Sequence, residues 1–299
     1  MTFSIAAIDK VNKEVGFAIA SCCWDSGRVC SAQTEIGAIA SQANGNLSFL
    51  HLFFDKLGEK MSLDDILNHF REVDEDIETR QVGMITFEGE SLAFTGDKCD
   101  SWAGHKTGEN YSCQGNTLVG PEVIDSMVKA FERGKDPLMN RLCTALQAGD
   151  DAGGDARGKQ SARVLVLKKD CWPGSDILVD IIIEDHPEPV KEIARILDVR
   201  SILVQGYQLF GDFSKASDEE KPDILEKIEK FMEDKTECRY SDFWTGLGMM
   251  YYKMGNMEKA VNAFRKSLEI SPPLMKSLKG NAEKGLLPRK LADLIFEGR

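Results

Sequence analysis

The second residue of the chain, Thr2, carries the hydroxyl group best placed to act as a nucleophile. We expect removal of Met1, because the residue that follows it is small, so that threonine begins the mature chain. A terminal threonine joins a hydroxyl to an α-amine whose ordinary pKa, about 8, suits a general base at neutral pH. This pairing is a recognised form of nucleophilic catalysis. We therefore predict Thr2 as a catalytic residue.

A polar stretch at residues 149–161 is rich in glycine and aspartate. Four glycines in thirteen residues permit positive φ angles and close backbone approach. The stretch lacks the closing Glu of an EF-hand, and Gln160 stands where a phosphate-binding loop needs Ser or Thr. It is an active-site loop or a turn whose charges satisfy one another; a divalent-metal site is a third alternative. Its predicted substrate-binding residues are Asp155, Arg157, Lys159 and Ser161.

The tripeptide at residues 114–116 could stabilise a developing negative charge. A backbone N–H at Gly115 and the side-chain amide of Asn116 are donors of the kind that hold an oxyanion. The alternative is a β-bulge at a strand end. We predict both residues as catalytic.

Four further polar or aromatic residues are predicted to bind substrate. Trp102, His105 and Glu109 lie in what reads as a short glycine-containing loop, and Gln42 ends a predicted strand. Side chains of this kind line pockets, or they hold local backbone by hydrogen bonds. The sequence leaves both alternatives open.

The eight cysteines and four histidines predict neither disulfides nor a metal centre. No C-x-x-C pair is present and the histidines are scattered, whereas a structural zinc site needs four converging ligands. The pair Cys22-Cys23 has no histidine near it in sequence to activate a thiol. We expect reduced thiols, and no metal or other cofactor.

Hydrophobic periodicity predicts the elements that must position these residues. Strands are expected at 2–9, 15–19, 35–42, 81–87, 91–95, 111–118, 162–167 and 176–184. Helices are expected at 47–57, 63–72, 121–133 and 137–149. Blocks of strands that alternate with helix pairs predict an α+β domain with two sheets faced by helices.

The chain from about Pro189 onward reads as helical, which divides it into domains at 1–198 and 199–299. Seven positions follow the tetratricopeptide spacing, which predicts a helical hairpin; they are Trp244, Leu247, Gly248, Tyr251, Ala260, Phe264 and Pro272. One such unit cannot bury its own face, so flanking helices must cover it. This all-α extension either packs on the main domain or binds a peptide.

The composition is that of an acidic globular protein. The hydrophobic fraction is 42%, the charged fraction is 29% and the net charge is −12. Nucleic acid is not expected as a partner, because phosphate binding needs clustered positive charge. No apolar run reaches the length that crosses a bilayer, and the start does not resemble a secretory signal. We expect a cytoplasmic protein with no membrane partner.

Short motifs distributed along residues 1–198 carry a family resemblance. They are MTFSI (1–5), RQVG (80–83), FTG (94–96), WAGH (102–105), QGN (114–116), GPEV (120–123), AGD (148–150), GGD (153–155), RGKQS (157–161) and DHP (185–187). Together they resemble the DUF1028 family, which is assigned to the N-terminal-nucleophile (Ntn) hydrolase superfamily. The resemblance implies a four-layer αββα sandwich and amide-bond hydrolysis, without a substrate. It also implies a homo-oligomer.

The sequence departs in one respect from proteasome-like members of the Ntn superfamily. Proteasome-like enzymes use a lysine on a nearby strand to tune the α-amine, whereas Arg28 is the only basic residue between Val15 and Asn46 in this chain. Arginine cannot shuttle protons, although its charge could lower the pKa of the amine. We include Arg28 among the predicted catalytic residues.

Two functions remain at this point. The first is an Ntn-type amidohydrolase with Thr2 as nucleophile and a small-molecule or peptide amide as substrate. The alternative is a non-catalytic binding or assembly protein, in which residues 199–299 recruit a protein partner.

Overall fold

The computed structural model describes residues 2–297 of the 299-residue chain. The chain divides into two compact units, of which the first ends at Asp198 and the second begins at Val199. The first unit combines helices with two antiparallel sheets, and the second is built from helices. Within the described residues, no helix has the length and apolar character needed to pass through a membrane.

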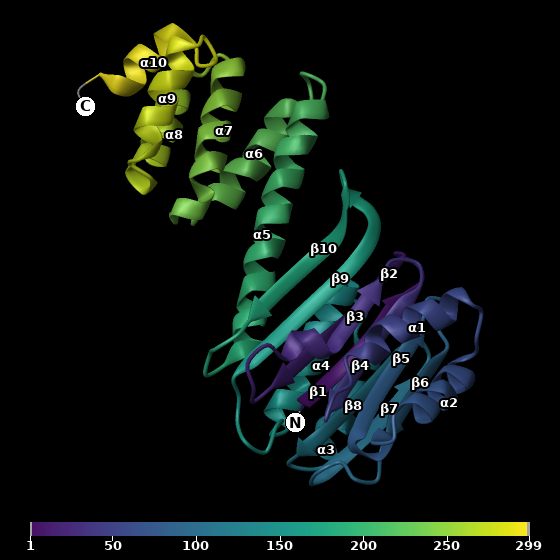
Figure 1. Cartoon of the computed structure of the whole chain (residues 1–299). Coiled ribbons are helices and arrows are strands. Elements are labelled where there is room, and N and C mark those ends of the chain that lie inside the picture. Colours follow the sequence, from purple (N-terminus) through teal and green to yellow (C-terminus); the bar gives the residue numbers. More distant parts are fainter. Residues whose placement is uncertain (1, 298–299) are drawn as a thin grey trace. The chain divides into compact units, whose positions relative to one another are not determined.

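Strand β1 (Thr2–Asp9) is an inner strand of a six-stranded sheet (Figure 1). It pairs with β2 (Glu14–Ser21) on one side and with β8 (Tyr111–Leu118) on the other, and the register places Thr2 opposite Asn116. The order is β10-β9-β2-β1-β8-β7, completed by β7 (Trp102–Gly108), β9 (Ser161–Trp172) and β10 (Ser175–Ile183). Thr2 is therefore held by strands on both sides.

The second sheet has four strands in the order β3-β4-β5-β6. Its members are β3 (Cys30–Gln33), β4 (Gly37–Ala43), β5 (Arg80–Thr86) and β6 (Ser91–Thr95). The strands predicted at 81–87 and 91–95 are confirmed, with the first beginning one residue earlier.

A pair of helices covers one face of each sheet. Helices α3 (Glu122–Arg133) and α4 (Leu138–Asp151) pack on the six-stranded sheet, in a core shared with the first residues of α5 (Pro189–Lys215). Helices α1 (Ser48–Gly58) and α2 (Leu63–Val73) pack on the four-stranded sheet. All four helices predicted for this unit are present, because each has an apolar stripe at helical spacing.

The start of α2 shows how local sequence fixes an element boundary. Ser62 has extended backbone angles, and its hydroxyl oxygen accepts a hydrogen bond from the backbone N–H of Asp65 at 3.2 Å. Such a cap satisfies one of the N–H groups that a helix leaves without an intrahelical partner. The Ser62 cap therefore accounts for the start of α2 at Leu63.

The remaining faces of the two sheets meet, and their contact has an apolar and a polar part. The apolar part contains Ala6, Phe17 and Ile85 among its buried residues. The polar part contains fully buried amides, among them Gln81 and Gln114. Buried amides are stable only when they are hydrogen-bonded, so this part must form a network.

Local structure differs from the prediction at several places, among them the following three. The expected loop around Trp102 and His105 is the edge strand β7, whose WAGHKTG sequence lacks apolar alternation because none of its residues is fully buried. The short strand β3 was not predicted. Helix α4 continues to Asp151, so the expected loop at residues 149–161 begins inside its last turn.

The second unit takes in the later part of α5 and five further helices among its described residues. They are α6 (Lys221–Met232), α7 (Ser241–Lys253), α8 (Met257–Ile270), α9 (Leu274–Glu283) and α10 (Arg289–Phe296).

Helices α7 and α8 form the predicted hairpin. A Cβ on Gly248 would lie 2.6 Å from Cδ2 of Phe264, so glycine is needed where the two helices touch. Neighbouring helices share the core, as one isolated repeat requires.

The close approach of the sheets at Gly83 generates a prediction. A Cβ on Gly83 would lie 1.8 Å from Oε1 of Gln114, which is itself fully buried. We expect Gly83→Ala to lower the free energy of unfolding by about 3 kcal/mol, because the crowded amide cannot move without losing its hydrogen bonds. Urea denaturation measures this. Gly58→Ala, at a helix end with no atom within 4 Å, is the control and should leave stability unchanged or higher. Equal stabilities for the two variants would contradict the prediction.

Candidate active site around Thr2

Thr2 is buried at the head of β1, with 6% of its surface exposed. Its hydroxyl donates a hydrogen bond to Oγ of Ser21 at 3.3 Å, and its carbonyl oxygen accepts one from Nε2 of Gln42 at 3.2 Å. Ser21 ends β2 and Gln42 lies near the end of β4, so both sheets hold this residue. The nucleophile predicted from sequence therefore has a fixed position.

A hollow of about 330 Å³ opens beside Thr2. Its lining contains Thr2, Cys23, Trp24, Asp25, Ser26, Arg28, Val29, Gln42, Ala43, Asn44, Gly45 and Leu47. Three residues predicted from sequence, Thr2, Arg28 and Gln42, thus line one cavity. The Arg28 side chain is 65% exposed and lies 3.9 Å from the Asp25 carboxylate, so its charge is partly screened by solvent.

A second hollow, of about 450 Å³, shares Ala43 and Asn44 with the first. The rest of its lining is Thr79, Lys98, Cys99, Asp100, Asn116 and Thr117. Because Asn116 lies opposite Thr2 in the sheet register, the ends of β1 and β8 reach both hollows. The two hollows together form the candidate site.

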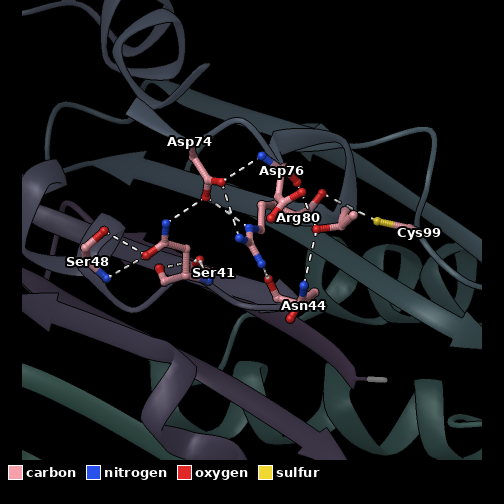
Figure 2. A network of polar contacts seen from close by, with 9 residues as sticks. Ser41, Asn44, Ser48, Asp74, Asp76, Arg80 and Cys99 are labelled. Atoms are coloured by element: carbon pink, nitrogen blue, oxygen red, sulfur yellow. Dashed lines mark hydrogen bonds and ion pairs between the residues drawn. The ribbon is translucent and has the colours of Figure 1, made fainter. Parts of the chain in front are cut away.

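The wall that the hollows share is held by a buried ion pair (Figure 2). Nε of Arg80 lies 3.0 Å from a carboxylate oxygen of Asp74, and the same guanidinium donates to the carbonyl oxygen of Asn44. Asn46 donates to that carboxylate at 2.7 Å. The hydrogen bond from Arg80, with smaller contributions from Asn46, lowers the pKa of Asp74. Ala43, at the centre of the wall, has a φ of +67°, a strained value for a residue with a Cβ.

The opposite wall, residues 22–29, is held by the predicted polar loop. The carboxylate of Asp155 accepts a hydrogen bond from the backbone N–H of Cys22 at 3.0 Å and pairs with Arg157 at the same distance. Ser161 donates to the carbonyl oxygen of Cys23 at 2.6 Å. Asp155 and Ser161 therefore position the wall rather than line either hollow.

Lys159 lies between two carboxylates. Its ammonium group is 2.7 Å from Asp150 and 2.7 Å from Glu188, and these hydrogen bonds raise the pKa of Lys159 against the effect of its burial. With Arg157 paired to Asp155, the cations of the loop are held by neighbouring carboxylates. This geometry fits the alternative in which the charges of the loop satisfy one another.

A network of buried side chains fills the space between the sheets next to Thr2. Gln114 donates to Oγ of Ser4 at 2.7 Å, and Ser4 donates to Oε1 of Gln42 at 2.7 Å. Gln42 in turn donates to Oε1 of Gln81 at 2.8 Å, and Asn116 donates to the same oxygen at 3.0 Å. The side chain of Asn116 thus has a defined orientation at the edge of the second hollow.

The other predicted residues lie apart from the hollows. His105 contacts Oγ1 of Thr95 through Nδ1 at 2.8 Å, and burial lowers its pKa. Trp102 packs with the core beneath α3 and α4. Glu109 lies in the turn between β7 and β8, at the end of β1 opposite to Thr2. A Cβ on Gly115 would meet Leu118 on the helix side of the sheet.

Sequence reasoning missed Gln81 as well as the ion pair of Asp74 and Arg80. A signal existed for Gln81, since a polar residue at an inward position of an apolar strand must find a buried partner. The sequence contains no such signal for the ion pair. Arg80 holds the wall through the carbonyl oxygen of Asn44, and only folding brings these two residues together. In residues 2–297, no three His, Cys, Asp or Glu side chains are grouped as a metal ion would require.

Comparison with known proteins places this site in a family. Residues 2–193 match the family of unknown function DUF1028. The chain belongs to the DUF1028 family. The crystal structure of another DUF1028 protein, SPO2555 from Silicibacter pomeroyi, is similar to this chain. The two sequences are 28% identical, the TM-score is 0.60, and the match covers 66% of this chain and 84% of that one.

Residues 241–273 match the tetratricopeptide repeat. A search of curated proteins found no match. The DUF1028 match therefore contains Thr2 and every residue of the two hollows.

The ion pair in the shared wall predicts a pH dependence. Because the folded-state pKa of Asp74 is lowered, its stabilisation is complete above the unfolded value, about 3.9, and is lost as pH falls through the lower folded value. We expect Asp74→Asn to reduce the free energy of unfolding at pH 7 by about 3 kcal/mol and to flatten its decline below pH 4. Denaturation at several pH values measures both. Asp55→Asn, at an exposed position of α1, should change stability by less than about 0.5 kcal/mol. An unchanged acid profile in Asp74→Asn would refute the assignment.

Proposed function

We propose that the first unit is an αββα sandwich of the Ntn-hydrolase type and that it hydrolyses an amide bond with Thr2 as nucleophile. The observation that carries the proposal is the place of Thr2, at the head of an inner strand and in the wall of a hollow. The helix pairs on the outer faces of two facing sheets agree with such a fold. The substrate is a small-molecule or peptide amide.

The reaction begins with a proton transfer on one residue. After loss of Met1, the free α-amine of Thr2 accepts the hydroxyl proton while Oγ1 attacks the substrate carbonyl. The tetrahedral oxyanion receives a hydrogen bond from the amide of Asn116, which lies opposite Thr2. The amine then protonates the leaving nitrogen, and an ester remains on Oγ1. Water hydrolyses the ester and regenerates threonine.

Each of the two hollows has a cation in its lining. Arg28 lines the first hollow and Lys98 lines the second. A positive charge near an amine lowers its pKa, which increases the fraction of free base at neutral pH. In this proposal Arg28 and Lys98 act through their charges, and the Thr2 amine alone moves the proton.

A second candidate function is assembly with a protein partner. The tetratricopeptide match at residues 241–273 supports it, because helices of such repeats commonly present a binding surface. In this proposal the first unit is a scaffold and the partner binds residues 199–299. A homo-oligomer likewise remains a prediction.

Covalent labelling tests the catalytic proposal. A peptide epoxyketone offers adjacent electrophiles to the hydroxyl and the amine of a terminal threonine, so we expect an adduct on Thr2 once intact mass shows that Met1 is absent. Thr2→Ala should abolish labelling with little change in melting temperature, and Thr2→Ser should retain it at a lower rate. Cys23→Ser controls for the thiol in the same hollow and should still be labelled. Full retention of Met1 in the native host, or an adduct on Thr2→Ala, would refute the mechanism.

A further inference from the structure

The side-chain amide of Gln81 links the two sheets. Gln81 lies on β5, is fully buried, and directs its amide toward the six-stranded sheet. Its nitrogen donates to the carbonyl oxygen of Gly115 at 2.8 Å, to that of Gly104 at 3.1 Å and to Oγ1 of Thr95 at 2.8 Å. Because a backbone carbonyl can only accept, the nitrogen of Gln81 must face that sheet.

The orientation of the Gln81 amide determines which of its atoms bonds to Asn116. Because the nitrogen donates to the carbonyl groups, Oε1 faces the remaining neighbours. This oxygen accepts hydrogen bonds from Asn116 at 3.0 Å and from Gln42 at 2.8 Å. The nitrogen of Asn116 is therefore turned toward Gln81, and one N–H of that group remains for another acceptor. Asn116 lines the second hollow, although only 2% of its surface is exposed. In the proposed mechanism, that N–H donates to a group bound in the hollow.

The same oxygen acts on Thr2 by a second route. Gln42 donates to the carbonyl oxygen of Thr2 as well as to Gln81, so the position of Gln42 depends on the acceptor it finds at Gln81. One buried atom thus holds a neighbour of Thr2 on each sheet.

We propose that Gln81 is a positioning residue of the Thr2 site, which fixes the amide of Asn116 as an oxyanion donor and, through Gln42, the backbone of Thr2. This role rests on the proposed function, since it gives Asn116 a task in amide hydrolysis. Gln81 lines neither hollow and acts only through its neighbours.

Gln114 supplies a matched control. It is also fully buried between the sheets and also donates through Nε2, but it donates to Ser4, and its Oε1 accepts from Ser112. Methionine has nearly the same volume as glutamine. Replacing either glutamine by methionine therefore removes one buried amide between the sheets and leaves the volume of the side chain almost unchanged. Only the change at Gln81 removes the acceptor of Asn116.

The kinetics of Thr2 labelling by a peptide epoxyketone test the proposal on the full chain without Met1. We expect Gln81→Met to lower the maximal labelling rate at least about tenfold, with the half-saturating probe concentration within about twofold, because an oxyanion donor acts in the transition state. Gln114→Met should lower that rate less than about threefold. In the Asn116→Ala background, Gln81→Met should lower the rate by a smaller factor than it does alone, because only the route through Gln42 remains. Equal losses for the two methionine variants, or additive losses in the double variant, would overturn the proposal.

A conservative variant covers the case in which Gln81→Met does not fold. Gln81→Glu keeps an oxygen for Asn116 and Gln42, and burial between carbonyls raises the pKa of a carboxyl group, so its protonated form resembles glutamine. We expect Gln81→Glu to label faster than Gln81→Met, or to label at all if the methionine variant is unfolded. A glutamate variant that folds but loses labelling as completely as Asn116→Ala would count against the role of Oε1.

The side-chain amide of Asn116 gives a readout that needs no catalysis. In ¹⁵N-labelled protein, Gln81→Met, or Gln81→Glu if that variant alone folds, should shift the NMR signal of this amide and speed its hydrogen exchange, while Gln114→Met should not. If wild-type protein without Met1 is never labelled, the proposed hydrolysis fails, and this measurement still decides whether Gln81 orients Asn116. An Asn116 signal that is unchanged in the Gln81 variant would overturn the inference in either case.

Discussion

An amide side chain buried between two sheets is stable only when nearly all of its hydrogen-bonding atoms have partners, and the first unit depends on this condition at Gln81. Its bonds reach the neighbouring β6, cross to β7 and β8 of the other sheet, and return to Gln42 on β4. A slip of one residue in β5 would turn the amide toward the wrong face, and a slip in one of the other strands would displace its partner there. The network therefore specifies strand register as well as local geometry.

The contact between the sheets changes character along the strands. Toward Ile8 it is closed by apolar side chains, whereas toward Thr2 it consists of amides and hydroxyls beside two hollows. The walls of these hollows are themselves fixed by polar contacts, at Asp74 on one side and Asp155 on the other. A site built in this way is preorganised, because its groups need not pay for ordering when a ligand arrives.

Local signals in the sequence were sufficient for most of the elements. The apolar stripe of α1, the Ser62 cap of α2 and the tetratricopeptide spacing of α7 and α8 all act within a few residues of the chain. The edge strand β7 was missed because its residues lack alternation, although its backbone bonds to β8 hold it in the sheet. The network was missed for a different reason. Gln42 was predicted on its own, but its connections to Ser4, Gln81 and Gln114 were not, because these residues are far apart in sequence and only the pairing of two sheets brings their side chains together.

The place of Thr2 within the sheet constrains the order of events in the life of the chain. A peptidase binds the residues on both sides of the bond it cuts in an extended form, with their backbone groups free. Once β1 is seated between β2 and β8, the backbone of Thr2 faces Asn116 and its side chain is buried. If Thr2 is the nucleophile that we propose, the methionine has to leave while the first strand is still emerging or unpaired. In that mechanism, a chain that folds before this step would lack the free amine and would be inactive, however well its sheets are formed.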